Sequence, residues 1–252
     1  MTSEPPVLGA VGPGLTDLPI PRNLEAETIA VPADRGPGHW VGAPSALVRD
    51  GIHYVAYRSR RPVDDGRGGD VVVARVAGDG RLDELCRIDK RSMDAESLER
   101  PALVTDGSGR WRLYLSCATT GTRHWRVELL QADSPDAFNT AGRRVVMPGD
   151  EHVAMKDPVS RPSSSAARPL SRSTTGVGML PRTGRSRTGI AAGRPARLAA
   201  VGEAPVAQAS GAYPAPRYAA VVDDGDRTAV YYEIGCDDGS HELRREWFAR
   251  TS

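Results

Sequence analysis

Residues 43–57 read APSALVRDGIHYVAY, and residues 100–114 read RPALVTDGSGRWRLY. Each stretch has a proline in second place, then a short apolar run, an Asp-Gly pair and an alternating aromatic segment. The prolines at 44, 101 and 158 are spaced by 57 residues both times. Self-similarity at a fixed period of this length is typical of repeat architectures.

Each repeat is predicted to form four antiparallel strands. The Asp-Gly pair favours a tight hairpin, because Gly accepts positive φ and Asp tolerates it. After the first apolar run and its turn, alternation of apolar and polar residues predicts further strands. These strands are expected at 52–57, 70–76 and 84–88 in the first repeat, and at 111–116, 125–132 and 143–147 in the second. Four such strands match one blade of a β-propeller; a β-sandwich with coincidental spacing is the alternative.

The pattern returns near the C-terminus. Residues 217–232 again read as an apolar strand, an Asp-Gly turn and an alternating strand, and Pro216 lies 58 residues after Pro158. The sequence therefore predicts an all-β protein with a single propeller domain over residues 35–252. Residues 1–34 are expected to be an irregular or edge segment.

One segment breaks the pattern. Between Pro158 and Gly202 there are eight Arg, no Lys, no acidic residue and no aromatic residue. This composition favours an irregular or disordered insert at about residues 160–205, replacing most of one blade. Two compensating frameshifts in a GC-rich gene are the other explanation. The segment has no aromatic residues for base stacking, so nucleic acid is not an expected partner.

The bulk composition excludes several classes of function. The net charge is +1 with 26% charged residues, which gives no reason to expect nucleic acid or a membrane surface as partner. No apolar run approaches the roughly 20 residues of a membrane span, and no secretory signal is evident. The expectation is a cytoplasmic monomer. Cys86, Cys117 and Cys236 form no close pair, so neither a disulfide framework nor a metal site is expected, and no cofactor is implied.

Three stretches carry a family resemblance: PGHWVGAPSALVRDGIHYVAYR at 37–58, SLERPALVTDGSGRWRLYLS at 97–116 and MKDPV at 155–159. They resemble the blade starts of five-bladed β-propeller glycoside hydrolases of families 43 and 32. The resemblance covers about residues 35–160 and 213–250. It implies a five-bladed propeller of four-stranded antiparallel blades, and a carbohydrate ligand held where the blade starts converge.

The resemblance also implies catalytic roles. Glu99, in Glu-Arg-Pro, is similar to the family's general acid, and Asp157, in Lys-Asp-Pro, is similar to its auxiliary aspartate. Hydrolysis of a glycosidic bond needs two carboxyl groups that flank the bond. The family's first-blade Asp, which acts as base or nucleophile, falls here on Ala43, and Glu99 precedes Asp157 where the family has the opposite order. As alternatives, Glu99 pairs with a neighbouring arginine and Asp157 caps a turn.

The expected substrate-binding residues are His39, Trp40, Arg58, Arg100 and Arg217. His39 and Trp40 would form a sugar-stacking platform, and the arginines would grip hydroxyl or carboxylate groups. Trp40 as a core or rim aromatic and the arginines as solvated or paired charges are the alternatives.

Three functions stay open: a glycoside hydrolase acting on an oligo- or polysaccharide through carboxylate acid/base catalysis, a non-catalytic propeller that binds carbohydrate or protein, and an inactive product of a frameshifted glycosidase gene.

Overall fold

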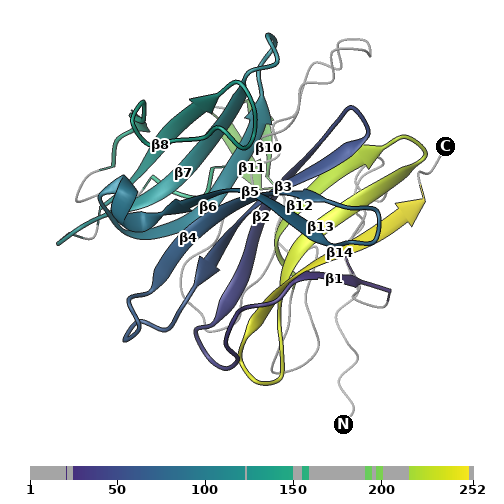
Figure 1. Ribbon diagram of the computed structural model, residues 1–252, viewed down its shortest axis with the longest axis horizontal. Coiled ribbons are helices and arrows are strands. Elements are labelled where there is room, and N and C mark those ends of the chain that lie inside the picture. The colour runs from purple at the N-terminus through teal and green to yellow at the C-terminus, as the bar shows by residue number, and fades with distance from the viewer. Residues whose placement is uncertain are drawn as a thin grey trace.

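The computed structural model describes residues 21, 25–122, 124–149, 155–158 and 216–249, together with the backbone of 191–194 and 197–200. Most of the regular structure of the described residues is β-strand, in an eight-stranded sheet, a four-stranded sheet and a two-stranded hairpin. A single bridge divides the eight-stranded sheet into two four-stranded parts, so that three four-stranded antiparallel sheets surround a common centre (Figure 1). Among the described residues no helix has the length and apolar character needed to cross a membrane.

Two of the sheets are simple meanders. The first contains β2 (Trp40–Arg49), β3 (Ile52–Arg60), β4 (Gly68–Val76) and β5 (Leu82–Asp89). After the 3-10 helix η1 (Lys90–Met93), the second contains β6 (Ala95–Thr105), β7 (Trp111–Thr119), β8 (Trp125–Ala132) and β9 (Arg144–Met147). Every strand predicted from the two repeats is thereby confirmed.

The third sheet joins the two ends of the described chain. It contains β12 (Arg217–Asp224), β13 (Arg227–Gly235) and β14 (His241–Ala249), and β1 (Glu27–Ala30) pairs with β14 as its outer strand. Ile29 of β1 is buried, and Glu27 accepts hydrogen bonds from Arg245 Nε at 3.0 Å and Trp247 Nε1 at 3.2 Å. A single parallel bridge, His241 to Trp40, links this sheet to the first.

The strand β4 shows why these sheets surround a centre. Val71 and Val73 belong to the apolar core shared with the second sheet, whereas Val72 and Ala74 belong to the core shared with the third. Successive residues of a strand point to opposite faces, so both faces of the first sheet are buried. This explains an uninterrupted apolar run where a half-exposed strand would alternate with polar residues.

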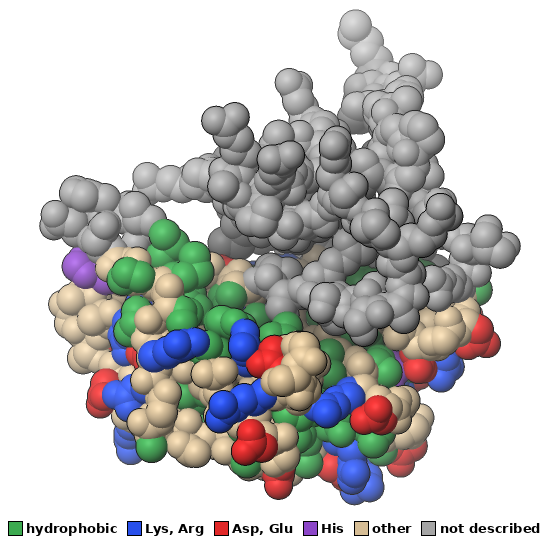
Figure 2. Space-filling model, turned by 90° about the horizontal axis from the view of Figure 1, so that it is seen from above, with side chains coloured by type: hydrophobic (Ala, Val, Ile, Leu, Met, Phe, Trp, Pro, Cys, Tyr) green, Lys and Arg blue, Asp and Glu red, His purple; other side chains and the backbone are tan. Residues whose placement is uncertain are grey.

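Of the innermost strands, β2 contacts both β6 and β12 and lies between them. Figure 2 shows basic and acidic side chains interspersed over the visible face, with no large area of one sign, in agreement with a net charge of +1.

The segment expected to be irregular contains one departure from that expectation. The strands β10 (Ala191–Arg194) and β11 (Arg197–Ala200) form a two-stranded antiparallel hairpin. Alanine and glycine carry little side-chain periodicity, so the sequence pattern gave no strand signal there. The rest of the predicted insert, from 160 to 190, at 195–196 and from 201 to 205, lies outside the described residues.

Candidate functional site

Each innermost strand is interrupted by a bulge at a corresponding point. The pairing register shifts between Gly42 and Ser45 in β2, between Leu98 and Pro101 in β6, and between Arg217 and Ala220 in β12. Bulges bend a strand and redirect its side chains, and proline, which lacks an N–H group, is tolerated in them. The side chains at and beside these bulges form one cluster where the three sheets meet.

Arg58 lies at the centre of this cluster. It is paired with Gly42 across the β2–β3 ladder and its side chain is 1% exposed. Its Nη1 lies 3.1 Å from Glu99 Oε2, and its Nη2 donates to Glu233 Oε2 at 3.1 Å. Burial lowers the pKa of Arg58, but the charges of Glu233 and Glu99 raise it by more than burial lowers it. The pKa of Arg58 therefore lies above its ordinary value. Arg58 thus joins the first, second and third sheets through ion pairs.

Glu233 on β13 is the most deeply buried acid of the cluster, with 0% exposure. It also accepts a hydrogen bond from Arg217, and its Oε1 lies 2.6 Å from His241 Nδ1. Burial alone would raise the pKa of Glu233, but Arg58, His241 and Arg217 hold it well below its usual range. A Cβ at Gly42 would come within 2.5 Å of the Glu233 side chain, so this glycine allows the close approach.

Two aromatic rings line the arginines. Trp40 stacks on His241 with ring centroids 4.4 Å apart, and the Arg60 guanidinium lies 4.3 Å from the Trp40 ring centroid. The ring of Tyr218, whose φ is 55°, lies 5.5 Å from the Arg58 guanidinium and 5.6 Å from that of Arg100. These contacts are cation–π interactions, which bind strongly where the cation is desolvated.

The two expected catalytic acids lie in different surroundings. Glu99 is buried, and besides Arg58 it faces Arg60, whose Nη1 is 3.6 Å from Glu99 Oε1. Asp157 has a φ of 57°, and its N–H donates to Ser116 Oγ at 2.8 Å. Its carboxylate raises the pKa of both Arg58 and Arg100, so it lies near the same arginines.

The first-blade position carries no acid. Ala43 is fully buried and has a φ of 51° within the β2 bulge. The left-handed region is unfavourable for an alanine, so the surrounding structure holds this backbone in place. The side chain at this bulge is therefore a buried methyl group, which can neither donate nor accept a proton.

Most of the expected site residues are brought together by the fold: Trp40, Arg58, Glu99, Arg100, Asp157 and Arg217. His39 precedes Trp40 in the sequence, and its carbonyl accepts a hydrogen bond from the His241 N–H at 3.1 Å. Four further residues of the cluster are not predicted from the sequence: Arg60, Tyr218, Glu233 and His241. Glu233 had a usable signal, because a lone acid in the apolar run from Ala229 to Ile234 requires a buried partner.

Metal ligation has no candidate in this part of the chain. Among the described residues, no three or more His, Cys, Asp or Glu side chains are grouped so that they would hold an ion.

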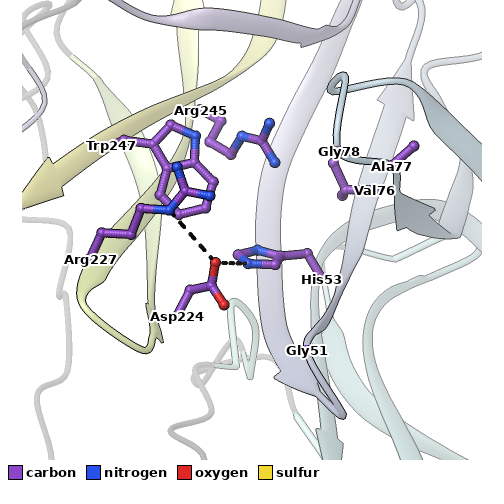
Figure 3. A pocket seen from close by; sticks show the side chains of 9 residues that line it. All are labelled: Gly51, His53, Val76, Ala77, Gly78, Asp224, Arg227, Arg245 and Trp247. Atoms are coloured by element: carbon purple, nitrogen blue, oxygen red, sulfur yellow. Dashed lines mark ion pairs between the residues drawn. The ribbon is translucent and has the colours of Figure 1, made fainter.

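A cavity of about 150 Å³ lies at the other end of β2 and β3, between the first and third sheets (Figure 3). His53 is buried in its wall, with Nε2 3.3 Å from Asp224 Oδ2 and Nδ1 2.9 Å from the Tyr231 hydroxyl. Arg227 lies 3.6 Å from the centroid of the Trp247 ring. These side chains link the first sheet to the third, opposite the arginine cluster.

His53 is expected to make stability fall on mild acidification. Burial lowers the pKa of His53 more than Asp224 raises it, with smaller lowering effects from Arg245 and Arg227. The unfolded chain then binds the proton first, so stability is lost as the pH falls from about 6.5 through the lower folded-state pKa. Urea unfolding at pH 7.5, 6.5 and 5.5 should show a smaller loss in His53→Gln than in the wild type. His124→Gln is the control, and equal pH dependence in His53→Gln and the wild type would contradict the assignment.

No protein-family model matches the sequence, and no curated protein matches it either. Solved structures match over nearly the whole chain. The GH43_1 enzyme from Xanthomonas citri has a TM-score of 0.54 and 14% identity, covering 90% of this chain and 92% of that one. A putative glycoside hydrolase from Parabacteroides distasonis has a TM-score of 0.54 and 11% identity, covering 91% and 96%.

A third similar structure is CoXyl43, a GH43 β-xylosidase/α-arabinofuranosidase from a compost microbial metagenome, solved in complex with xylotriose. Its TM-score is 0.51 at 12% identity, with 90% of this chain and 94% of that chain covered. The chain therefore has the fold of the GH43 glycoside hydrolases, and the prediction of a propeller is confirmed. Its three described sheets are blades of that propeller; a total of five blades stays a prediction. At such low identity the likeness concerns the fold alone.

Proposed function

We propose that this protein is a carbohydrate-binding propeller that holds a saccharide at the arginine cluster without hydrolysing it. The fold and the cluster favour a sugar ligand, since the similar Xanthomonas citri enzyme was solved in complex with xylose and with xylotriose. Guanidinium groups and aromatic faces are side chains suited to hydroxyl-rich rings. A fold alone does not determine which reaction a protein catalyses. The residues at the blade starts are the reason to propose binding without hydrolysis.

Ala43 is the observation that carries this proposal. Glycosidic hydrolysis requires one carboxyl group to protonate the leaving group and a second to act as base or nucleophile. A buried methyl group can do neither. Glu99 faces arginines with both of its oxygens, so it does not offer a leaving group a free carboxyl.

Binding is tested by calorimetric titration with xylotriose. Trp40→Phe should weaken binding about three- to tenfold, because the indole that stacks on His241 and meets the arginines is reduced to a smaller ring. Trp247→Phe makes the same change at the opposite end of the blades and should leave the affinity unchanged. Failure of any saccharide to bind the folded wild-type chain would overturn the proposal.

Hydrolysis by Glu99 and Asp157 is the second candidate. One observation favours it: the charges of both carboxylates raise the pKa of Arg58, so both lie in the arginine cluster. Aryl xylosides, arabinofuranosides and mannosides should be turned over no faster by the wild type than by the double variant Glu99→Gln/Asp157→Asn. Turnover by the wild type that disappears in each single variant would establish a hydrolase instead.

A further inference from the structure

Arg100 is a buried charge that forms no direct ion pair among the described residues. Its side chain is 4% exposed, its Nη2 donates to the Ala219 carbonyl at 3.2 Å, and its Nε has no hydrogen-bond partner. Burial lowers the pKa of Arg100, and Asp157 and other neighbours offset only part of that effect. An arginine nevertheless stays protonated in proteins, so its charge calls for a further anion.

The charges of the whole cluster are unequal. Four arginines face three carboxylates: Arg58, Arg60, Arg100 and Arg217 on one side, and Glu99, Glu233 and Asp157 on the other. Glu233 and Glu99 are engaged by the other three arginines. The acid left to Arg100 is Asp157, whose carboxylate also lies 3.7 Å from Lys156 Nζ. With Lys156 counted, five cations face three carboxylates, so the surroundings of Arg100 are short of negative charge.

Arg100 occupies a defined position in the sequence repeat. The residues before the prolines of three successive repeats are Ala43, Arg100 and Asp157. Arg100 thus occupies a bulge at a blade start, beside the ring of Tyr218 and next to Glu99. It lies in the cluster formed where the three bulged strands meet.

We infer that the saccharide bound by this protein is acidic, and that its carboxylate pairs with Arg100. This inference rests on the proposed carbohydrate-binding function and names its ligand class. The planar fork of an arginine matches a carboxylate with two parallel N–H···O bonds. The fourth negative charge then comes from the ligand.

The first test changes the ligand and leaves the protein intact. Glucuronate, glucose and glucuronamide are titrated into the wild-type chain by calorimetry; they share a ring and differ in the charge at C6. Glucuronate should bind at least about tenfold more tightly than the two neutral compounds, and this advantage should shrink as salt is raised.

The second test changes the arginine. Arg100→Met keeps the length of the side chain and should abolish the preference for glucuronate, whereas Arg100→Lys keeps the charge and should retain part of it. Arg75→Met is the control, since the Arg75 side chain on β4 is close to half exposed and pairs with Asp83 at 2.8 Å. Circular dichroism of each variant reports whether it folds, and the wild-type ligand series decides the charge preference even if Arg100→Met does not fold.

The outcomes distinguish failure of the acidic-ligand inference from failure of the proposed carbohydrate-binding function. If glucose and glucuronamide bind as tightly as glucuronate, the acidic ligand is excluded and the carbohydrate-binding function stands. If none of these sugars nor xylotriose binds, the proposed function fails and this inference with it. A preference for glucuronate that survives in Arg100→Met would remove Arg100 from its role.

Discussion

Glu233→Gln is expected to lower the free energy of unfolding by about 3–5 kcal/mol. The substitution keeps the volume of a fully buried side chain but removes the charge that Arg58, Arg217 and His241 share. Arg58 is 1% exposed and, among the described residues, would keep Glu99 alone as a close ionic partner. Removing one member of a buried ion pair is costly because the remaining charge has no access to water. Urea denaturation followed by tryptophan fluorescence measures the loss.

The matched control is Glu84→Gln on β5. Glu84 pairs with Arg87, but both side chains are close to half exposed, and surface pairs of this kind contribute about 0–1 kcal/mol. Equal unfolding midpoints for Glu233→Gln and Glu84→Gln would show that the buried network does not stabilise the fold. In the wild type, the contribution of Glu233 is present above its ordinary pKa of 4.5 and should be lost as acidification protonates the carboxylate.

Trp111→Ala is expected to cost about 3–5 kcal/mol. Trp111 on β7 is buried in the core between the first and second sheets, and its ring meets that of Tyr54 edge to face at 4.8 Å. The Arg49 guanidinium also lies 5.3 Å from the Trp111 ring centroid. The variant would leave a cavity at the contact between two blades, and the blades themselves have little freedom to collapse into it.

Val145→Ala on β9 provides the comparison, because Val145 is 49% exposed and a surface substitution changes stability by no more than about 0.5 kcal/mol. Both variants are measured by thermal unfolding with circular dichroism. A melting temperature of Trp111→Ala within a degree or two of that of Val145→Ala would contradict the role of Trp111 as an inter-blade contact.

The repeat was predictable because turn chemistry and spacing are local properties. The Asp50-Gly51 turn adopts positive φ at both residues, as the residue types demand, and the proline period located the bulged strands. By contrast, the ladder between β1 and β14 left no sequence signal. Four residues are too short to reveal a period, and their partner lies more than two hundred positions away.

The site was predictable only where a motif marked it. Glu99, Arg100 and Asp157 precede prolines and were found, whereas His241 and Tyr218 reach the cluster through pairing between distant strands. The network around Glu233 depends on three sheets meeting, which no local pattern encodes. Ala43 stands where the resemblance implies an acidic residue. The structure shows that this alanine is buried and has a left-handed backbone conformation within the β2 bulge.

The pairing of β1 with β14 sets an order of events for the nascent chain. The outer strand of the third sheet is translated about two hundred residues before its partner, His241–Ala249. During synthesis the edge of β1 therefore has no native neighbour for a long time, and an unpaired edge is a site of aggregation. The third sheet is completed only when β14 becomes available, through a contact of very large sequence separation. Such a contact slows refolding, and it makes β1 late to become protected from hydrogen exchange.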